Sequence, residues 1–189
     1  MKVIQTTNRI LSSTDMDTIS EALYAGAVIG FPTETVYGIG CLPAQQDAIA
    51  RIYQMKNRAR NKPLSLHISD VALVDKFVPS TPQYFDAFVQ LFWPGPVTLI
   101  LPDMQGNTVG LRFPDCPVTA NIIARCGGVI VGTSANMSGR ESAVNAEAVL
   151  HDFAGKIDVL IDDGPCRFSS DSTILLYDGK KTTIVRHGP

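Results

Sequence analysis

Apolar positions in this chain follow two different spacings, and the two alternate from one end to the other. In one kind of stretch they recur every three to four residues, as along one face of a helix. Residues 45–56 are the clearest example, since Ala48, Ile49, Ile52 and Met55 fall on one stripe. In the other kind, several apolar residues run together, as in a buried strand. Helices interleaved with strands indicate an α/β domain with a mixed sheet.

The patterns place the expected elements along the sequence. One helix is expected to begin at residues 14–17, with Thr14 as its cap, and others at 45–56, 71–77, 82–92, 118–125 and 147–153. Strands are expected at 27–31, 64–68, 97–101, 109–113, 129–133, 172–177 and 182–186. Asp178-Gly179 between the last two is typical of a tight hairpin. No repeat or linker interrupts the pattern, so we expect one domain over residues 1–189.

Composition narrows the class of protein. The chain has 189 residues, of which 45% are hydrophobic and 18% charged, as in an ordinary globular domain. A formal net charge of −2 provides no overall basic field for nonspecific nucleic-acid binding. No apolar run approaches the roughly 18 residues of a membrane helix, and the first residues turn polar too soon for a signal peptide. We therefore expect a cytoplasmic protein.

The metal-binding residue types are dispersed. Four cysteines are widely scattered and form no CxxC pair, and the three histidines are equally separated: Cys41, Cys116, Cys126, Cys166, His67, His151 and His187. This spacing favours free thiols in a reducing compartment over a zinc site. We therefore expect no metal site built from the protein's own side chains.

A polar cluster follows the strand expected at 27–31. Pro32 ends the apolar run, and Thr33, Glu34, Thr35 and Tyr37 come directly after it. Hydroxyls at the end of a buried strand are well placed to line a ligand crevice. A threonine-rich polar turn is the alternative, and this cluster taken alone favours it.

A cationic cluster, residues 56–62, follows the clearest helix. Lys56, Arg58, Arg60 and Lys62 place four positive charges in seven residues, with no acidic residue from 48 to 69. Such a cluster suits a polyphosphate held by side chains, because the chain has no glycine-rich Walker motif. A solvated helix end, where cations are favoured, explains it about equally well.

Further polar groups lie in or beside the expected strands. Ser134 and Asn136 follow the strand at 129–133 and could bind phosphate or ribose, although a Ser/Asn turn at a strand end is common. His67 lies at the end of a strand, where a lone histidine is more often structural than a ligand. Arg112 alternates with apolar neighbours, so it could point to solvent.

Three clusters occur in order: the polar cluster after residue 31, the cationic cluster at residues 56–62, and Ser134 with Asn136. Together they resemble the motifs of the YrdC/TsaC family of threonylcarbamoyl-AMP synthases. The resemblance covers nearly the whole chain and continues through residues 92–98 (FWPGPVT), 110–114 (GLRFP), 172–174 (STI) and 186–188 (RHG). It implies a YrdC-like twisted mixed β-sheet with surrounding helices and a large open cavity.

The resemblance also implies an activity. Members make threonylcarbamoyl-AMP and pyrophosphate from L-threonine, bicarbonate and ATP, a nucleotidyltransferase reaction that serves threonylcarbamoyladenosine modification of tRNA. We expect Mg²⁺ to accompany the ATP, and a downstream tRNA threonylcarbamoyl-transferase complex to take the product, without tight direct tRNA binding. The alternative is an RNA-binding module for tRNA or double-stranded RNA, which the short basic run and negative net charge disfavour. A paralogue with another ligand is less expected, since Lys56 and Asn136 are retained.

The family's site residues carry over position by position. The resemblance implies that L-threonine contacts Thr35, His67, Arg112, Ser134 and Ser172. It implies that ATP contacts Lys56, Arg58, Lys62, Thr108, Asn136 and Arg186, with Lys56 and Arg58 the catalytic cations. We expect both of these cations to protrude from the helix end, so that removing either costs little stability. Residues 140–144 lack the proline-threonine pair of many relatives, so their contact with ATP stays open.

Overall fold

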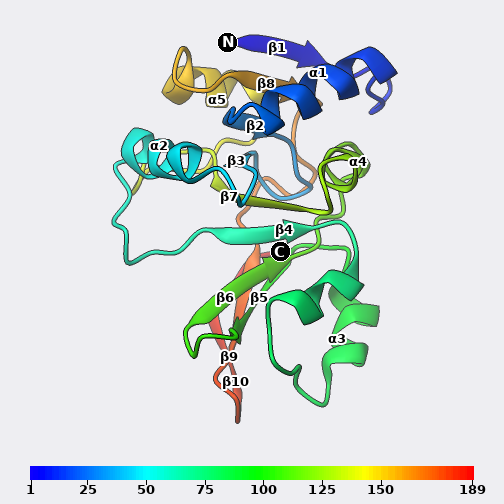
Figure 1. Ribbon diagram of the computed structural model, residues 1–189, viewed down its shortest axis with the longest axis vertical. Coiled ribbons are helices and arrows are strands. Elements are labelled where there is room, and N and C mark those ends of the chain that lie inside the picture. Colours follow the sequence, from blue (N-terminus) through cyan, green and yellow to red (C-terminus); the bar gives the residue numbers. More distant parts are fainter.

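A computed structural model describes residues 1–189, and one mixed ten-stranded sheet runs through it (Figure 1). The strands are β1 (Lys2–Gln5), β2 (Ile29–Phe31), β3 (Gly38–Cys41), β4 (Ser65–Ile68), β5 (Val97–Pro102), β6 (Thr108–Arg112), β7 (Val129–Ser134), β8 (Val159–Asp162), β9 (Thr173–Tyr177) and β10 (Thr182–Arg186). Their order across the sheet is β1-β8-β2-β3-β7-β4-β6-β5-β9-β10. The β1–β8, β2–β8, β4–β6 and β5–β9 pairs are parallel and the others antiparallel. The predicted α/β class with a mixed sheet is confirmed.

Helices lie around the sheet along its length. They are α1 (Ser13–Tyr24), α2 (Gln46–Lys56), the 3₁₀ helix η1 (Val71–Lys76), α3 (Phe85–Phe92), α4 (Pro117–Arg125) and α5 (Ala146–Phe153). In Figure 1, α1, α2, α4 and α5 lie around the half of the sheet that contains β1, whereas α3 lies beside the half that contains β5. None of these helices has the length and apolar character that a membrane span requires.

The expected elements are present, with two corrections. Helix α1 begins earlier than predicted, because Ser12 and not Thr14 is its cap: the Ser12 Oγ accepts a hydrogen bond from the Asp15 amide at 3.1 Å. Strands β1, β3 and β8 were not predicted. Strand β3 has the sequence Gly-Ile-Gly-Cys. Glycine is uncommon in strands, so the residue preferences of this segment do not predict one.

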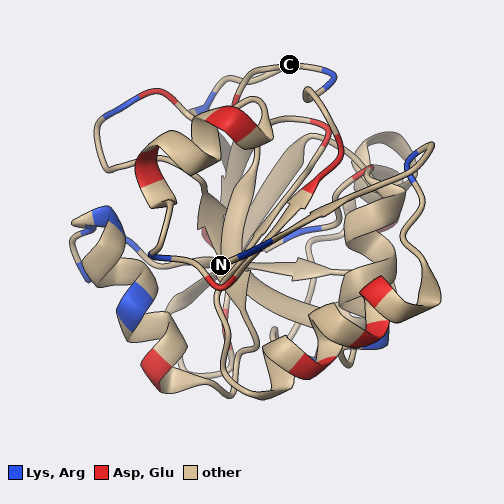
Figure 2. Ribbon diagram, turned by 90° about the horizontal axis from the view of Figure 1, so that it is seen from above, with Lys and Arg blue, Asp and Glu red and all other residues tan.

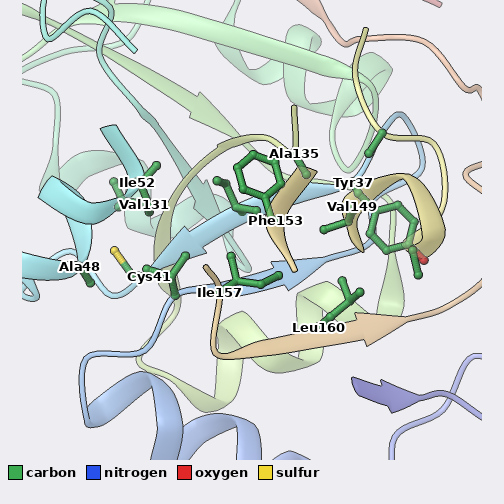
Figure 3. Packing of buried hydrophobic residues seen from close by; sticks show 14 of the residues in the cluster. Tyr37, Cys41, Ala48, Ile52, Val131, Ala135, Val149, Phe153, Ile157 and Leu160 are labelled. Carbon is green, nitrogen blue, oxygen red and sulfur yellow. The ribbon is translucent and has the colours of Figure 1, made fainter. Parts of the chain in front are cut away.

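The core consists of three apolar clusters. The first packs α2 and α5 against β3, β7 and β8, with Ile52 and Phe153 fully buried (Figure 3). The second packs α1 and α4 with β1, β2 and β8, and the third packs η1 and α3 with β4, β5 and β6. All four cysteines are buried and free.

Strands β3 and β7 approach each other closely where two glycines face one another. Gly40 pairs with Gly132, and the buried Phe31 ring lies over both. A Cβ added to Gly40 would lie 2.5 Å from the Val131 carbonyl oxygen, which is backbone and cannot turn away. The same register pairs Gly38 with Ser134, so this contact also sets the spacing of two residues that line the pocket described below.

We predict that Gly40→Ala destabilises the fold by about 1–3 kcal/mol, because the added methyl overpacks a rigid backbone contact. Gly110→Ala is the matched control, since the nearest atom to its Cβ is a side-chain oxygen, Ser65 Oγ, at 3.0 Å. Urea unfolding of both variants measures the difference. Equal midpoints for the two would show that the β3–β7 approach is not tight.

Candidate functional site

A polar pocket lies where the middle strands of the sheet meet the loop before β9. Its sixteen lining residues come mainly from the β2–β3 turn and from strands β4 to β7, and only three of them are hydrophobic. The volume is about 150 Å³, below the roughly 300–1,000 Å³ of pockets that enclose drug-sized ligands. The pocket therefore suits a small polar molecule, or part of a larger one.

A buried ion pair lies at the wall of this pocket. The Arg112 Nη2 donates to Glu34 Oε1 at 2.9 Å and to Thr35 Oγ1 at 2.6 Å. The Arg112 and Glu34 side chains are only 6% and 2% exposed, so the alternative that Arg112 points to solvent is wrong. Glu34 and Thr35 come from the β2–β3 turn and Arg112 from the end of β6, so tertiary folding alone brings them together.

Three buried side-chain atoms have no hydrogen-bond partner within the protein, and all belong to this region. They are Glu34 Oε2, Arg112 Nε and His67 Nδ1. Arg112 and His67 both line the pocket, and parallel pairing of β4 with β6 sets them side by side. Buried polar groups are normally satisfied, so unpartnered ones beside a pocket indicate a site for a ligand or ordered water.

His67 is held as a neutral ring. Burial first, and the nearby Arg112 cation second, lower the pKa of His67 to about 3. The ring also packs edge-on against Phe31 at 5.5 Å between centroids. Toward a ligand, His67 therefore acts as a neutral hydrogen-bonding group and not as a cation.

A second polar network lines the pocket from the loop before β9 and from β10. The Arg186 Nη2 donates to Ser172 Oγ at 3.2 Å, and Ser172 Oγ lies 3.0 Å from Thr98 Oγ1. Arg186 also pairs with Asp171 at 3.3 Å, and Asp171 accepts from Ser142 Oγ at 2.8 Å. These contacts connect the loop after β7 to the C-terminal hairpin.

The structure corrects the expectation that Lys56 protrudes from the helix end. The residue is 1% exposed, and its Nζ donates to the Asn136 carbonyl at 2.6 Å, to Asn136 Oδ1 at 3.3 Å and to the Ser134 carbonyl. Asn57 adopts a left-handed conformation (φ 50°) that ends α2, so Lys56 still lies on the buried face of the helix. Burial first, and Arg58 second, lower the pKa of Lys56 to about 8, which leaves it protonated at neutral pH.

Six of the predicted site residues line the pocket: Arg58, His67, Arg112, Ser134, Ser172 and Arg186. Thr35 lies behind Arg112, and Lys56 and Asn136 lie behind Ser134. Lys62 and Thr108 are exposed outside the pocket, although the Lys62 carbonyl accepts from Arg58 Nε at 2.9 Å. Basic positions continue along α2 and past its end, at the left of Figure 2.

Sequence reasoning missed five polar lining residues: Thr33, Ser65, Thr98, Thr133 and Asp171. Ser65 could have been predicted from the sequence, because it lies two residues before His67 and therefore on the same face of the strand. Thr33 belonged to the polar turn already singled out. Thr98 and Asp171 carried no signal of their own, since only the folded chain places them beside Ser172 and Arg186.

The matching family model covers residues 21–188 and is that of the Sua5/YciO/YrdC family, described as "Telomere recombination". Two relatives named threonylcarbamoyl-AMP synthase come from Bacillus subtilis (36% identical) and Pyrococcus abyssi (34%), matched over 85% and 86% of this chain. These matches cover 49% and 51% of the relatives, so the chain spans about half their length.

A solved structure agrees with this match. The P. abyssi Sua5 structure complexed with L-threonine has a TM-score of 0.91 and 28% identity, over 99% of this chain and 57% of the other. E. coli YciO has the same fold, with a TM-score of 0.87, 20% identity and coverage of 99% of this chain and 94% of the other. The YrdC-like fold is therefore confirmed.

We predict that Lys56→Met lowers the free energy of unfolding by about 1–3 kcal/mol, because it leaves the buried Asn136 carbonyl without a hydrogen-bond partner. Lys62→Met is the matched control, since Lys62 is exposed in the same basic segment. Denaturant unfolding at pH 7 compares the two. Equal stabilities would restore the original view of Lys56 as a protruding cation.

The low pKa of His67 predicts a pH dependence of stability. As pH falls from about 6.5 toward 3, the unfolded chain takes up a proton that the folded His67 does not. The free energy of unfolding should then fall by up to about 1.4 kcal/mol per pH unit, and His67→Gln should remove this contribution. Urea unfolding between pH 7.5 and 4 tests it, and an unchanged slope in the variant would contradict a neutral, buried His67.

Proposed function

The chain belongs to the Sua5/YciO/YrdC family, and on that premise we propose that it is a threonylcarbamoyl-AMP synthase. In this proposal it is a nucleotidyltransferase that makes threonylcarbamoyl-AMP and pyrophosphate from L-threonine, bicarbonate and ATP. The product would serve threonylcarbamoyladenosine modification of tRNA. The proposal rests on family membership, on relatives that carry this name, and on a pocket whose polar groups suit these substrates.

One observation carries the assignment to an amino-acid substrate: the unpartnered Arg112 Nε beside the unpartnered, neutral His67. A guanidinium with a free donor is suited to a carboxylate. A neutral imidazole beside it can hydrogen-bond a hydroxyl or amine without adding charge. A small α-amino acid with a hydroxyl side chain fits this set and the pocket volume of about 150 Å³.

We place the nucleotide across the mouth of the pocket and not within it. Arg58 and Arg186 line the pocket, are partly exposed, and can reach the phosphates from two sides. Lys62 and Thr108 remain candidates for contacts farther out. Lys56 and Asn136 have their polar atoms engaged within the protein, so in this proposal they support the nucleotide site indirectly.

The proposed chemistry requires no protein nucleophile. The threonine amine combines with bicarbonate to give a carbamate and water, and a carbamate oxygen then displaces pyrophosphate from the α-phosphorus of ATP. Holding three reactants in line and stabilising charge on the phosphates can supply most of the rate enhancement. Arg58 and Arg186 are the groups available for the second task.

Mg²⁺ enters this proposal with ATP, as part of the MgATP substrate. Mg²⁺ is usually held by substrate phosphates and one or two carboxylates. Asp171 is the carboxylate that lines the pocket, and it already lies beside Arg186. We further propose that the adenylate passes to a downstream tRNA threonylcarbamoyl-transferase complex, and that this chain does not bind tRNA tightly by itself.

We predict that pyrophosphate release from ATP requires both L-threonine and bicarbonate. Arg58→Ala should reduce the rate by about 10²–10³, the cost of losing one donor that stabilises developing charge. Arg60→Ala is the matched control, because Arg60 lies two residues away, is exposed and does not line the pocket.

A coupled pyrophosphate assay measures both requirements, and a thermal melt of each variant checks its fold. Equal release with no amino acid or no bicarbonate would overturn the proposed reaction. If Arg58→Ala slowed pyrophosphate release no more than Arg60→Ala does, the nucleotide would not lie over Arg58.

A further inference from the structure

The turn after β7 is wrapped around a buried ammonium group. Lys56 Nζ has three protons, and three oxygens of residues 134–136 accept them. The Lys56 carbonyl also accepts from the Ser138 amide at 3.0 Å. Of the residues that contact the Lys56 ammonium, Ser134 at the end of β7 is the one that lines the pocket. Lys56 therefore holds the pocket wall from behind.

The ammonium fixes the orientation of the Asn136 amide. Asn136 Oδ1 accepts from Lys56 at 3.3 Å, and Nδ2 donates to the Arg140 carbonyl at 2.6 Å. A flipped amide would set an NH₂ group against an ammonium and an oxygen against a carbonyl oxygen. Both contacts would be repulsive, so only one orientation is compatible with the surroundings.

This orientation decides where the Ser134 proton goes. Ser134 Oγ lies 2.6 Å from Asn136 Oδ1, which can only accept, so the hydroxyl must donate to it. A serine has one hydroxyl proton and two lone pairs. With its proton committed to Asn136, Ser134 turns only lone pairs toward the pocket.

We infer that Lys56 is a positioning residue that acts through Asn136 to make Ser134 a hydrogen-bond acceptor toward the amino-acid substrate. The bound group must then be an N–H or O–H donor, namely the amine or the side-chain hydroxyl. Phosphate oxygens have no such proton, so Ser134 does not bind the phosphates, and it lines the pocket in which we place the amino acid. This inference rests on the proposed function, since it names the part of that substrate that Ser134 contacts.

Binding of L-threonine by isothermal titration calorimetry tests the inference. Ser134→Ala and Asn136→Ala should each weaken L-threonine binding about tenfold, the range of one buried hydrogen bond, and in Ser134→Ala the affinity for MgATP should change less than twofold. Ser138→Ala is the control, because this exposed side chain belongs to the same turn.

A double-mutant cycle separates positioning from a general structural effect. If Asn136 acts through Ser134, the Ser134→Ala/Asn136→Ala double variant should bind L-threonine no more weakly than either single variant. A purely structural effect would be additive. If Ser134 instead donated to the substrate carboxylate, Asn136→Ala would free its proton and leave binding unchanged or stronger.

A ligand without the hydroxyl identifies the donor. L-2-aminobutyrate keeps the amine, so loss of the Ser134→Ala effect with this ligand assigns the contact to the hydroxyl, and persistence assigns it to the amine. Both results support an acceptor role. Unchanged L-threonine binding in Ser134→Ala, or additive losses in the cycle, overturns the inference alone. Failure of the wild type to bind L-threonine overturns the proposed function as well.

Discussion

The ion pair between Arg112 and Glu34 is the constraint on which the site depends. Two charges removed from water cost several kcal/mol each unless they are paired and hydrogen-bonded, and here both side chains are at least 94% buried. The pair joins the β2–β3 turn to the end of β6, which lie on opposite sides of β7 and β4 in the sheet. The closed pair leaves Arg112 Nε unused, so the same contact that secures the fold presents a donor beside the pocket.

Two buried cations thus have opposite roles in this protein. Arg112 has a donor left over and lies in the pocket wall, whereas Lys56 has none left over and lies behind that wall. The difference follows from the number of hydrogen-bond acceptors near each cation. One glutamate oxygen and one hydroxyl accept from Arg112, whereas three oxygens accept from the Lys56 ammonium. An ammonium with all its donors satisfied stabilises a turn, and a guanidinium with one unsatisfied is available to a ligand.

The part of the chain that builds the pocket is also the part that the comparisons cover. Its lining residues fall between Thr33 and Arg186, within the matched residues 21–188. Two groups of polar residues line the pocket, one centred on Arg112 and His67 and the other on Ser172 and Arg186. In the proposed function, an amino acid in this pocket and a nucleotide over its mouth would place the carbamate beside the α-phosphorus without covalent help from the protein.

Patterns along the chain determined the α/β class, most elements and the three clusters that form the site, because helical periodicity and buried apolar runs are local properties. They did not show β3, whose glycines are required by a close approach to β7, nor the position of Thr98 and Asp171 beside the C-terminal hairpin. Above all, a lysine at a helix end looks the same in sequence whether it faces water or the interior. The tertiary structure alone decided that Lys56 is buried, because only folding brings the carbonyls of Ser134 and Asn136 to its ammonium.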